Sequence, residues 1–236
     1  MIVAIHQPNH LPYLGFFDKM KKADIFVVHD DAQFNKHEFQ HRNRIRVEKG
    51  WQYLIVPVYK KELSINQIKI KNHVQIGKRK WSIAHFEIIG DWYKKAPYFS
   101  IYEDDLRKIY EKECEKLIDL NMNLIRFLMK AFDIDKKIVY SSSFGFKSKR
   151  TQRIIDTVRA VGGDIYLSGP GGRNYLDTSL FTDIQLEFQD FKHPVYKQRY
   201  EGFVPNMAAI DALFNAGEMP EGDEKSQFQI LPNPNF

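Results

Sequence analysis

The chain has 236 residues, of which 43% are hydrophobic and 28% charged, as expected for one soluble globular domain. Its net charge of +5 suits an anionic small-molecule ligand and does not by itself indicate nucleic acid. The single cysteine, Cys114, excludes an intrachain disulfide and a thiolate-rich zinc site. No stretch approaches the roughly 20 apolar residues of a membrane span, and the short N-terminal apolar run has no basic leader. We therefore expect a cytoplasmic protein without a membrane span.

The first 30 residues predict a strand, a helix and a second strand. Residues 2–5 form a short apolar run, residues 14–22 have helical spacing of apolar side chains, and residues 25–28 form a second apolar run. Strand, helix and strand within about 30 residues indicate a parallel sheet. Residues 53–58 are predicted to continue this sheet, and residues 44–47 have the pattern of an edge strand.

The middle of the chain is predicted to be mainly helical. Residues 64–80 alternate apolar and basic side chains, which suggests exposed strand or loop with a basic face. Residues 81–132 then show helical periodicity, including 105–114 and 117–132. We interpret 81–133 as a helical insertion or cap, which could equally supply a dimer interface. Cys114 is interpreted as a semi-buried residue of a helix.

The last third returns to alternating strands and helices. Residues 138–141 and 165–167 are predicted strands around a helix at 150–161, which the glycine pair 162–163 ends. Residues 184–188 are a further strand and 210–215 a short helix. The sequence therefore predicts an α/β fold with a parallel sheet, in a single domain over residues 1–236.

Polar residues collect in the turn after the first strand. The stretch HQPNHLPYLG contains His6, Gln7, Asn9 and His10. In open parallel sheets, ligands bind beyond the carboxyl ends of the strands, where helix N-termini favour phosphate or carboxylate. This turn is a candidate anion site, although a structural turn with a buried histidine is the alternative.

A second polar group follows the second strand. Asp30 and Asp31 are expected at the same edge as His6, where they could bind a metal or a hydroxyl group. A basic and amide cluster comes next, and its arginines suit phosphate or carboxylate; it comprises Gln33, Asn35, Lys36, Arg42, Asn43 and Arg44. An exposed basic face or a solvated loop remains the alternative.

A third candidate is the glycine-rich loop YLSGPGGRNYLD. Glycines 169, 171 and 172 follow a strand directly, so their amides could cradle a phosphate, with Arg173 adding positive charge. The loop matches neither the P-loop nor the dinucleotide pattern. A plain tight turn is the alternative.

Taken in order, several blocks of the chain resemble the WbqC-like protein family. They include HQPNHLPYLGFFDKM, ADIFVVHDDAQFNKHEFQHRNRI, GGDIYLSGPGGRNYLD, HPVYKQ and FVPNMAAIDALFNAG, and span nearly the whole chain. The family is associated with bacterial O-antigen, lipopolysaccharide and other surface-polysaccharide clusters, and some members have been proposed to be glycine transferases. The resemblance implies recurrent positions at His6, Gln7, Pro8, Asp30, Gln33, Arg42, Ser168, Gly169, Tyr175, Gln198 and Asn206, whereas His10 departs from the expected aromatic residue.

The opening also resembles the HIGH-type nucleotidylyl transferases, pantothenate synthetases in particular. Their first-loop histidines contact ATP phosphates and a later loop closes over them; here His6 and His10 are four residues apart, where that family has three. This resemblance implies a nucleotidylyl-transferase-like (HUP-like) core with a helical insertion.

Together, the two resemblances imply an enzyme that activates a carboxylate with ATP and magnesium and transfers it to the amine of an amino sugar or nucleotide-linked amino sugar. His6 would hold phosphate, Arg42 or Arg173 would clamp an anion, and Asp30 would bind magnesium or orient the amine. Asp31 or a histidine would act as the base. Two alternatives remain open. One is a transferase that uses a nucleotide-sugar, acyl-CoA or aminoacyl-tRNA donor. The other is a non-catalytic scaffold of polysaccharide assembly.

Overall fold

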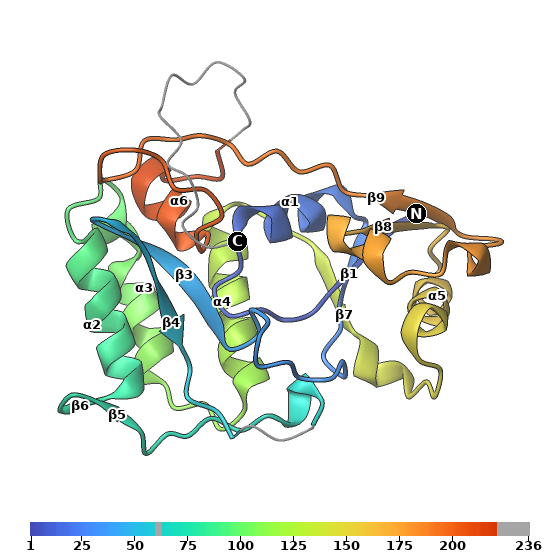
Figure 1. Cartoon of the computed structure of the whole chain (residues 1–236), viewed down its shortest axis with the longest axis horizontal. Helices are drawn as coiled ribbons and strands as arrows, with labels where there is room; N and C mark the ends of the chain where they lie inside the picture. Colours follow the sequence, from blue (N-terminus) through green and yellow to red (C-terminus); the bar gives the residue numbers. More distant parts are fainter. Residues whose placement is uncertain (60–62, 221–236) are drawn as a thin grey trace. The chain divides into compact units, whose positions relative to one another are not determined.

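The computed structural model describes residues 1–59 and 63–220, and the chain divides into two compact units (Figure 1). Unit 1 consists of Met1–Pro8, Gly15–Ala32 and Ile134–Phe191. Unit 2 consists of Asn9–Leu14, Gln33–Asp133 and the described residues from Lys192 onward. Most of unit 2 is therefore inserted between the second and third strands of unit 1. That the chain forms a single domain stays a prediction.

Unit 1 is built on a five-stranded parallel sheet, which confirms the predicted α/β class. Its strands are β1 (Ile2–His6), β2 (Ile25–Val28), β7 (Lys137–Tyr140), β8 (Ile165–Ser168) and β9 (Gln185–Phe188). They lie side by side in the order β7-β2-β1-β8-β9. From β1, the chain adds β2 and then β7 on one side, and later β8 and then β9 on the other side. The direction in which strands are added therefore changes between β1 and β8. Such a switch point is where open α/β sheets bind their ligands.

Side chains of β1 alternate between the two faces of this sheet, as the pleat requires. Val3 and Ile5 belong to a buried apolar cluster with Ile154, Ile155 and Val158 of α5 (Arg150–Ala160). The opposite face carries Ala4, His6 and Phe26, and meets α1 (Leu14–Lys22), where Phe16 packs edge-on against His6 and Phe26. His6 therefore ends β1 on the α1 face.

The glycine pair after α5 ends the helix as predicted. Gly162 adopts a left-handed φ of 78°, and its N–H donates to Arg159 O at 2.9 Å. A Cβ on Gly163 would lie 2.4 Å from Val3 Cγ2. Glycine is therefore required here for β8 to pair beside β1.

Unit 2 combines an antiparallel hairpin with helices. The hairpin is β3 (Arg42–Val47) and β4 (Gly50–Ile55); the helices are α2 (Trp81–Tyr93), α3 (Phe99–Glu111), α4 (Leu117–Ala131) and α6 (Ile210–Ala216). Two short strands, β5 (Gln75–Ile76) and β6 (Arg79–Lys80), pair with each other, and η1 (Ile65–Gln67) is a 3-10 turn. The prediction that residues 53–58 continue the parallel sheet is wrong. Leu54 is buried between the less buried Tyr53 and Ile55, an alternation typical of a half-exposed antiparallel strand.

Three helices occupy the predicted helical region 81–133, but Cys114 is not in a helix. Lys112 leaves α3 in an extended conformation, and the chain then pairs with residues 69–72. Asn72 Nδ2 donates to Cys114 O at 2.9 Å, and Ile70 N donates to Glu115 O at 2.9 Å. These bonds replace the helical ones, so the helical placement of Cys114 is wrong. Among residues 1–59 and 63–220, no helix has the length and apolarity needed to span a membrane.

Candidate functional site

The carboxyl edge of the unit 1 sheet gathers polar side chains from neighbouring strands. β1 ends at His6, β8 ends at Ser168, and β2 is followed by His29, Asp30 and Asp31. Parallel pairing sets the ends of β1 and β2 level, with His6 opposite Val28. Four predicted site residues, His6, Asp30, Asp31 and Ser168, therefore follow strand ends at one edge.

Lys19 lies at the same edge, and the sequence analysis did not identify it. Its side chain is 2% exposed, and Nζ donates to Ile5 O at 3.0 Å. It forms no ion pair with a carboxylate of the described residues. A Cβ on Gly169 would lie 3.8 Å from Nζ. The ammonium group is thus placed between the ends of β1 and β8, at the switch point of the sheet.

A buried lysine without a counterion is costly to the folded protein. Burial lowers the pKa of Lys19 from its usual 10.5 to about 7. A bound anion would supply the missing charge. The sequence does indicate that Lys19 is buried, because Lys19 follows Phe16 by three positions and so falls on the apolar face of α1.

His6 is held as a neutral imidazole beside this lysine. Burial, and then the positive charge of Lys19, lower the pKa of His6 from 6.5 to about 3, although by surface area the residue keeps some exposure. Nδ1 lies 2.9 Å from Gln7 O, and a carbonyl oxygen only accepts, so Nδ1 carries the proton. Nε2 therefore keeps a lone pair that can accept a hydrogen bond or a proton.

Asp30 and Asp31 are both tied to the segment that follows β7. Asp30 accepts from Ser142 N at 3.0 Å, Ser142 Oγ at 2.6 Å and Ser141 Oγ at 3.2 Å. Asp31 pairs with Arg153 of α5 and accepts from Ser141 Oγ. These bonds fix the two strand-end loops against each other. No group of histidine, cysteine or acidic side chains suited to a metal ion occurs in the described part of the chain.

The glycine-rich loop after β8 is a 3-10 turn, η3 (Pro170–Asn174), that folds back on the strand end. A Cβ on Gly172 would lie 2.1 Å from Ser168 Oγ, whereas one on Gly171 would meet nothing within 4 Å. Arg173 places its guanidinium 4.1 Å from the ring centre of Phe188, and Tyr175 is 64% exposed. Only Gly172 is sterically required for the turn.

Most of the other predicted site residues belong to unit 2. Asn9 and His10 are buried, Gln33 is exposed and forms a β-bridge with Ser64, and Arg42 lies on β3. His10 Nδ1 lies 3.2 Å from Asn121 Oδ1. Gln7, by contrast, belongs to unit 1 and follows β1 directly.

Gln198 is part of a buried polar network in unit 2. Its Nε2 donates to Asp211 Oδ2 at 2.8 Å and to Val204 O, and its Oε1 accepts from Arg46 Nε at 3.2 Å. Tyr93 and Tyr196 donate to the same Asp211 carboxylate. These bonds occupy the amide of Gln198, and its role in substrate binding stays a prediction.

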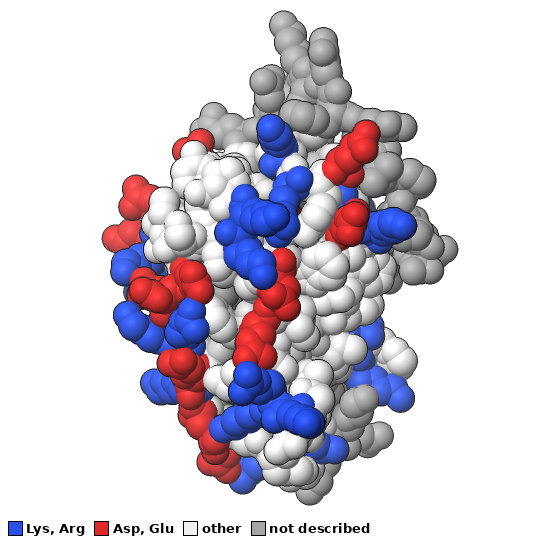
Figure 2. Space-filling view, turned by 90° about the vertical axis from the view of Figure 1, so that its left-hand side faces the viewer, with Lys and Arg blue, Asp and Glu red and all other residues white. Residues whose placement is uncertain are grey.

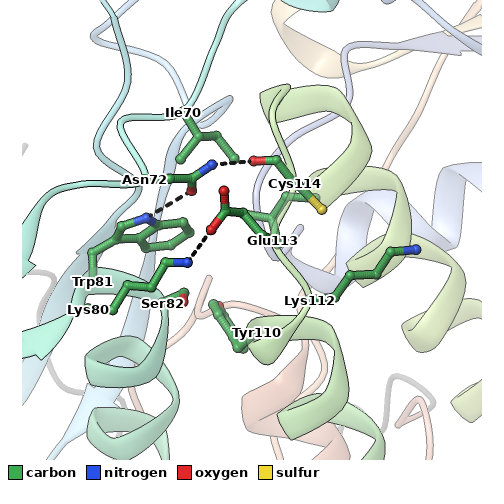
Figure 3. Close-up of a pocket in the computed structure, with 10 residues that line it drawn as sticks. Ile70, Asn72, Lys80, Trp81, Ser82, Tyr110, Lys112, Glu113 and Cys114 are labelled. Atoms are coloured by element: carbon green, nitrogen blue, oxygen red, sulfur yellow. Dashed lines mark hydrogen bonds and ion pairs between the residues drawn. The ribbon is translucent and has the colours of Figure 1, made fainter.

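A small pocket in unit 2 lies beside Cys114 (Figure 3). Trp81 Nε1 donates to Asn72 Oδ1 and Asn72 to the Cys114 carbonyl, while Lys80 pairs with Glu113. The cavity volume is about 10 Å³, room for about one water. It is too small to be the binding site of a nucleotide or sugar.

The predicted basic face around residues 69–80 is largely neutralised. Lys69 pairs with Glu115, Lys80 with Glu113 and Arg79 with Glu87. Figure 2 shows acidic side chains interspersed with basic ones over the visible face. Binding of tRNA requires basic side chains free to neutralise phosphates, so this segment gives it little support.

Comparison with known proteins assigns the chain to a family. The family model described as the WbqC-like protein family matches residues 7–221. The chain belongs to the WbqC-like protein family. This WbqC-like chain is also 30% identical over 229 residues to the uncharacterized protein Rv1507c of Mycobacterium tuberculosis, covering 93% of this chain and 96% of that protein. No solved structure matches the chain.

Proposed function

We propose that this WbqC-like protein is a group-transfer enzyme that binds the phosphate of a nucleotide at the carboxyl edge of unit 1. The observation that carries the proposal is Lys19, buried at the switch point between β1 and β8 without a carboxylate partner among the described residues. Nucleotide-binding sheets place their ligand phosphates at this point. The strand order supports a nucleotidylyl-transferase-like (HUP-like) core.

The reaction we propose is amide formation between an amino acid, glycine, and the amine of an amino sugar or nucleotide-linked amino sugar. A carboxylate oxygen attacks the α-phosphorus of ATP, and the bond to the leaving diphosphate breaks. The amine then attacks the acyl carbon, and AMP leaves with the electrons of the carbon–oxygen bond. The proton lost by the amine goes to a base.

Each residue at the edge has a role in this scheme. Lys19 binds the leaving diphosphate, next to the backbone amides at Gly169. His6 offers Nε2 to the attacking amine, and its low pKa keeps it unprotonated at pH 7. Bound phosphate offsets the charge of Lys19 and so raises the basicity of His6. Asp30 and Asp31 orient the loops through their hydrogen bonds to Ser141 and Ser142.

The test is thermal stabilisation by a ligand panel: ATP with magnesium, UDP- and dTDP-amino sugars, acyl-CoA and tRNA, each with and without glycine. A ligand at about 100 times its Kd adds about 2.7 kcal/mol of stability. We expect stabilisation by ATP that glycine increases and Lys19→Met abolishes. The matched control is Lys21→Met, which removes an exposed lysine of the same helix and should leave the response unchanged.

Other outcomes would redirect the proposal. Stabilisation by a sugar nucleotide alone, lost in Lys19→Met, would keep the phosphate site and replace ATP chemistry with a different donor. No thermal stabilisation by any nucleotide, or equal stabilisation of Lys19→Met, would refute the phosphate site and favour the hypothesis of a non-catalytic scaffold. A product assay with glycine, ATP and amino sugars then tests amide formation directly.

A further inference from the structure

One face of the β3–β4 hairpin in unit 2 combines arginines with aromatic rings. Arg42 and Arg44 are two residues apart on β3 and so lie on the same side, and the register places Arg44 opposite Tyr53. Trp51 and Tyr53, two apart on β4, complete this side. We refer to Arg42, Arg44, Trp51 and Tyr53 as the arginine face; all four side chains are partly exposed.

The rings hold the two guanidinium groups in place. Arg42 Cζ lies 4.8 Å from the ring centre of Tyr53, and Arg44 Cζ lies 5.2 Å from that of Trp51. Trp51 and Tyr53 pack edge to face at 4.9 Å. Stacking of this kind orders a guanidinium group in advance of any ligand.

Most side-chain donors of the arginine face have no acceptor among the described residues. Neither arginine forms an ion pair with a carboxylate of residues 1–59 and 63–220. Arg44 donates no side-chain hydrogen bond within these residues, and Arg42 donates one, from Nη2 to His37 O at 2.5 Å. Three buried N–H groups also lack a partner there: Nε of Arg42, Nε of Arg44 and Nε1 of Trp51.

Arg46, the next arginine along the same strand, shows what a structural arginine looks like in this hairpin. It is 1% exposed and donates to Gln198 Oε1 and to the carbonyl oxygens of Val47, Gly50 and Glu201. The contrast shows that the unused donors of Arg42 and Arg44 are not a general property of the strand.

We propose that the arginine face is a second oxyanion site, which binds the phosphate group of a small-molecule ligand. Two neighbouring guanidinium groups that pair with no carboxylate of the described residues favour a ligand that is both an anion and a hydrogen-bond acceptor. Phosphate satisfies both requirements, because guanidinium groups bind its oxygens in pairs. The site consists of unit 2 residues alone and so does not depend on the phosphate site at Lys19.

The experiment is a titration with inorganic diphosphate, followed by the indole N–H signals in a ¹⁵N-resolved NMR spectrum. The chain has three tryptophans, and Trp51→Phe assigns the signal of Trp51. The titration is done on full-length Lys19→Met protein, so that the proposed unit 1 site does not contribute. We expect the Trp51 signal to move saturably, while those of Trp81 and Trp92 stay in place.

Arg44→Met in the same background should weaken binding at least tenfold. The side chain of Arg44 has no hydrogen-bond partner among the described residues to leave unsatisfied, so the variant should fold. Lys49→Met is the matched control, because it removes an exposed positive charge from the turn of the same hairpin, and it should change affinity less than twofold. Equal losses of diphosphate affinity in the two variants would mean that only general electrostatic attraction is measured, and would overturn the site. A Trp51 signal that diphosphate does not move would overturn it as well.

Discussion

Nζ of Lys19 donates a hydrogen bond to the carbonyl oxygen of Ile5 at 3.0 Å, which joins α1 to the end of strand β1, next to His6. The bond satisfies one of the three N–H donors of the ammonium group. No carboxylate in the described part of the chain pairs with the charge. The stability of the protein and its proposed ligand binding therefore depend on this lysine in opposite directions.

Lys19→Met should stabilise the ligand-free protein by about 1–4 kcal/mol at pH 6, because a buried unpaired charge is replaced by an apolar side chain of similar length. The folded pKa of Lys19 is about 7, below its unfolded value. The penalty is therefore complete below pH 7 and disappears as the pH rises toward about 10.5. Urea unfolding of both proteins from pH 6 to 10 should show that the difference between their free energies of unfolding shrinks as the pH rises. A constant difference across this range would contradict the assignment.

The tight approach at the glycine-rich loop gives a second prediction. Gly172→Ala should destabilise the protein by about 1–3 kcal/mol and weaken nucleotide binding at the unit 1 edge, since its Cβ would overlap Ser168 Oγ. Gly171→Ala, one residue earlier, places its Cβ in open space and is the control. Thermal unfolding with and without ATP measures both effects. Similar results for the two alanines would show that Ser168 does not set the shape of the loop.

Asp211 anchors the polar network of unit 2. Its carboxylate is fully buried and accepts from Tyr93, Tyr196 and Gln198. Asp211→Ala should cost about 3–5 kcal/mol of stability, since it leaves these donors without their acceptor and removes the negative charge whose field acts on Arg46. Asp104→Ala removes a largely exposed carboxylate and should stay within about 0.5 kcal/mol. Denaturant unfolding of the two variants measures both changes in stability. A small change for Asp211→Ala would mean that water replaces the carboxylate.

Buried histidines of unit 2 predict a loss of stability in acid. Burial lowers the pKa of His10 to about 3 and that of His85 to about 4. The unfolded chain takes up protons near pH 6.5, before the folded protein does, so stability falls as the pH drops from about 6.5 toward 4. His10→Gln should make this fall shallower, which unfolding curves between pH 4 and 8 can measure. An unchanged slope would show that His10 is not the group that titrates.

Much of unit 1 could be predicted from local patterns. The apolar runs at 2–5 and 25–28 predict β1 and β2, and the Gly162 and Gly163 pair predicts the end of α5, because these signals act within a few residues. Polar residues after strands predict a site at the carboxyl edge for the same reason: parallel strands bring their ends together wherever they pair. His6 and Asp30 are predicted at that edge in this way, whereas Ser168 is implied by the family resemblance.

Hairpin pairing, buried polar partners and the environment of Lys19 were decided only by the tertiary structure. β4 pairs with β3 and not with the parallel sheet, a choice between partners that its own six residues do not encode. Cys114 leaves the helical pattern because residues 69–72 supply competing hydrogen bonds. Sequence spacing puts Lys19 on the apolar face of α1, but its burial without a carboxylate partner among the described residues arises only when β1, β8 and α1 come together. Helices, strands and strand-end chemistry follow from neighbours in sequence, whereas desolvation and partner choice depend on residues far apart in the chain.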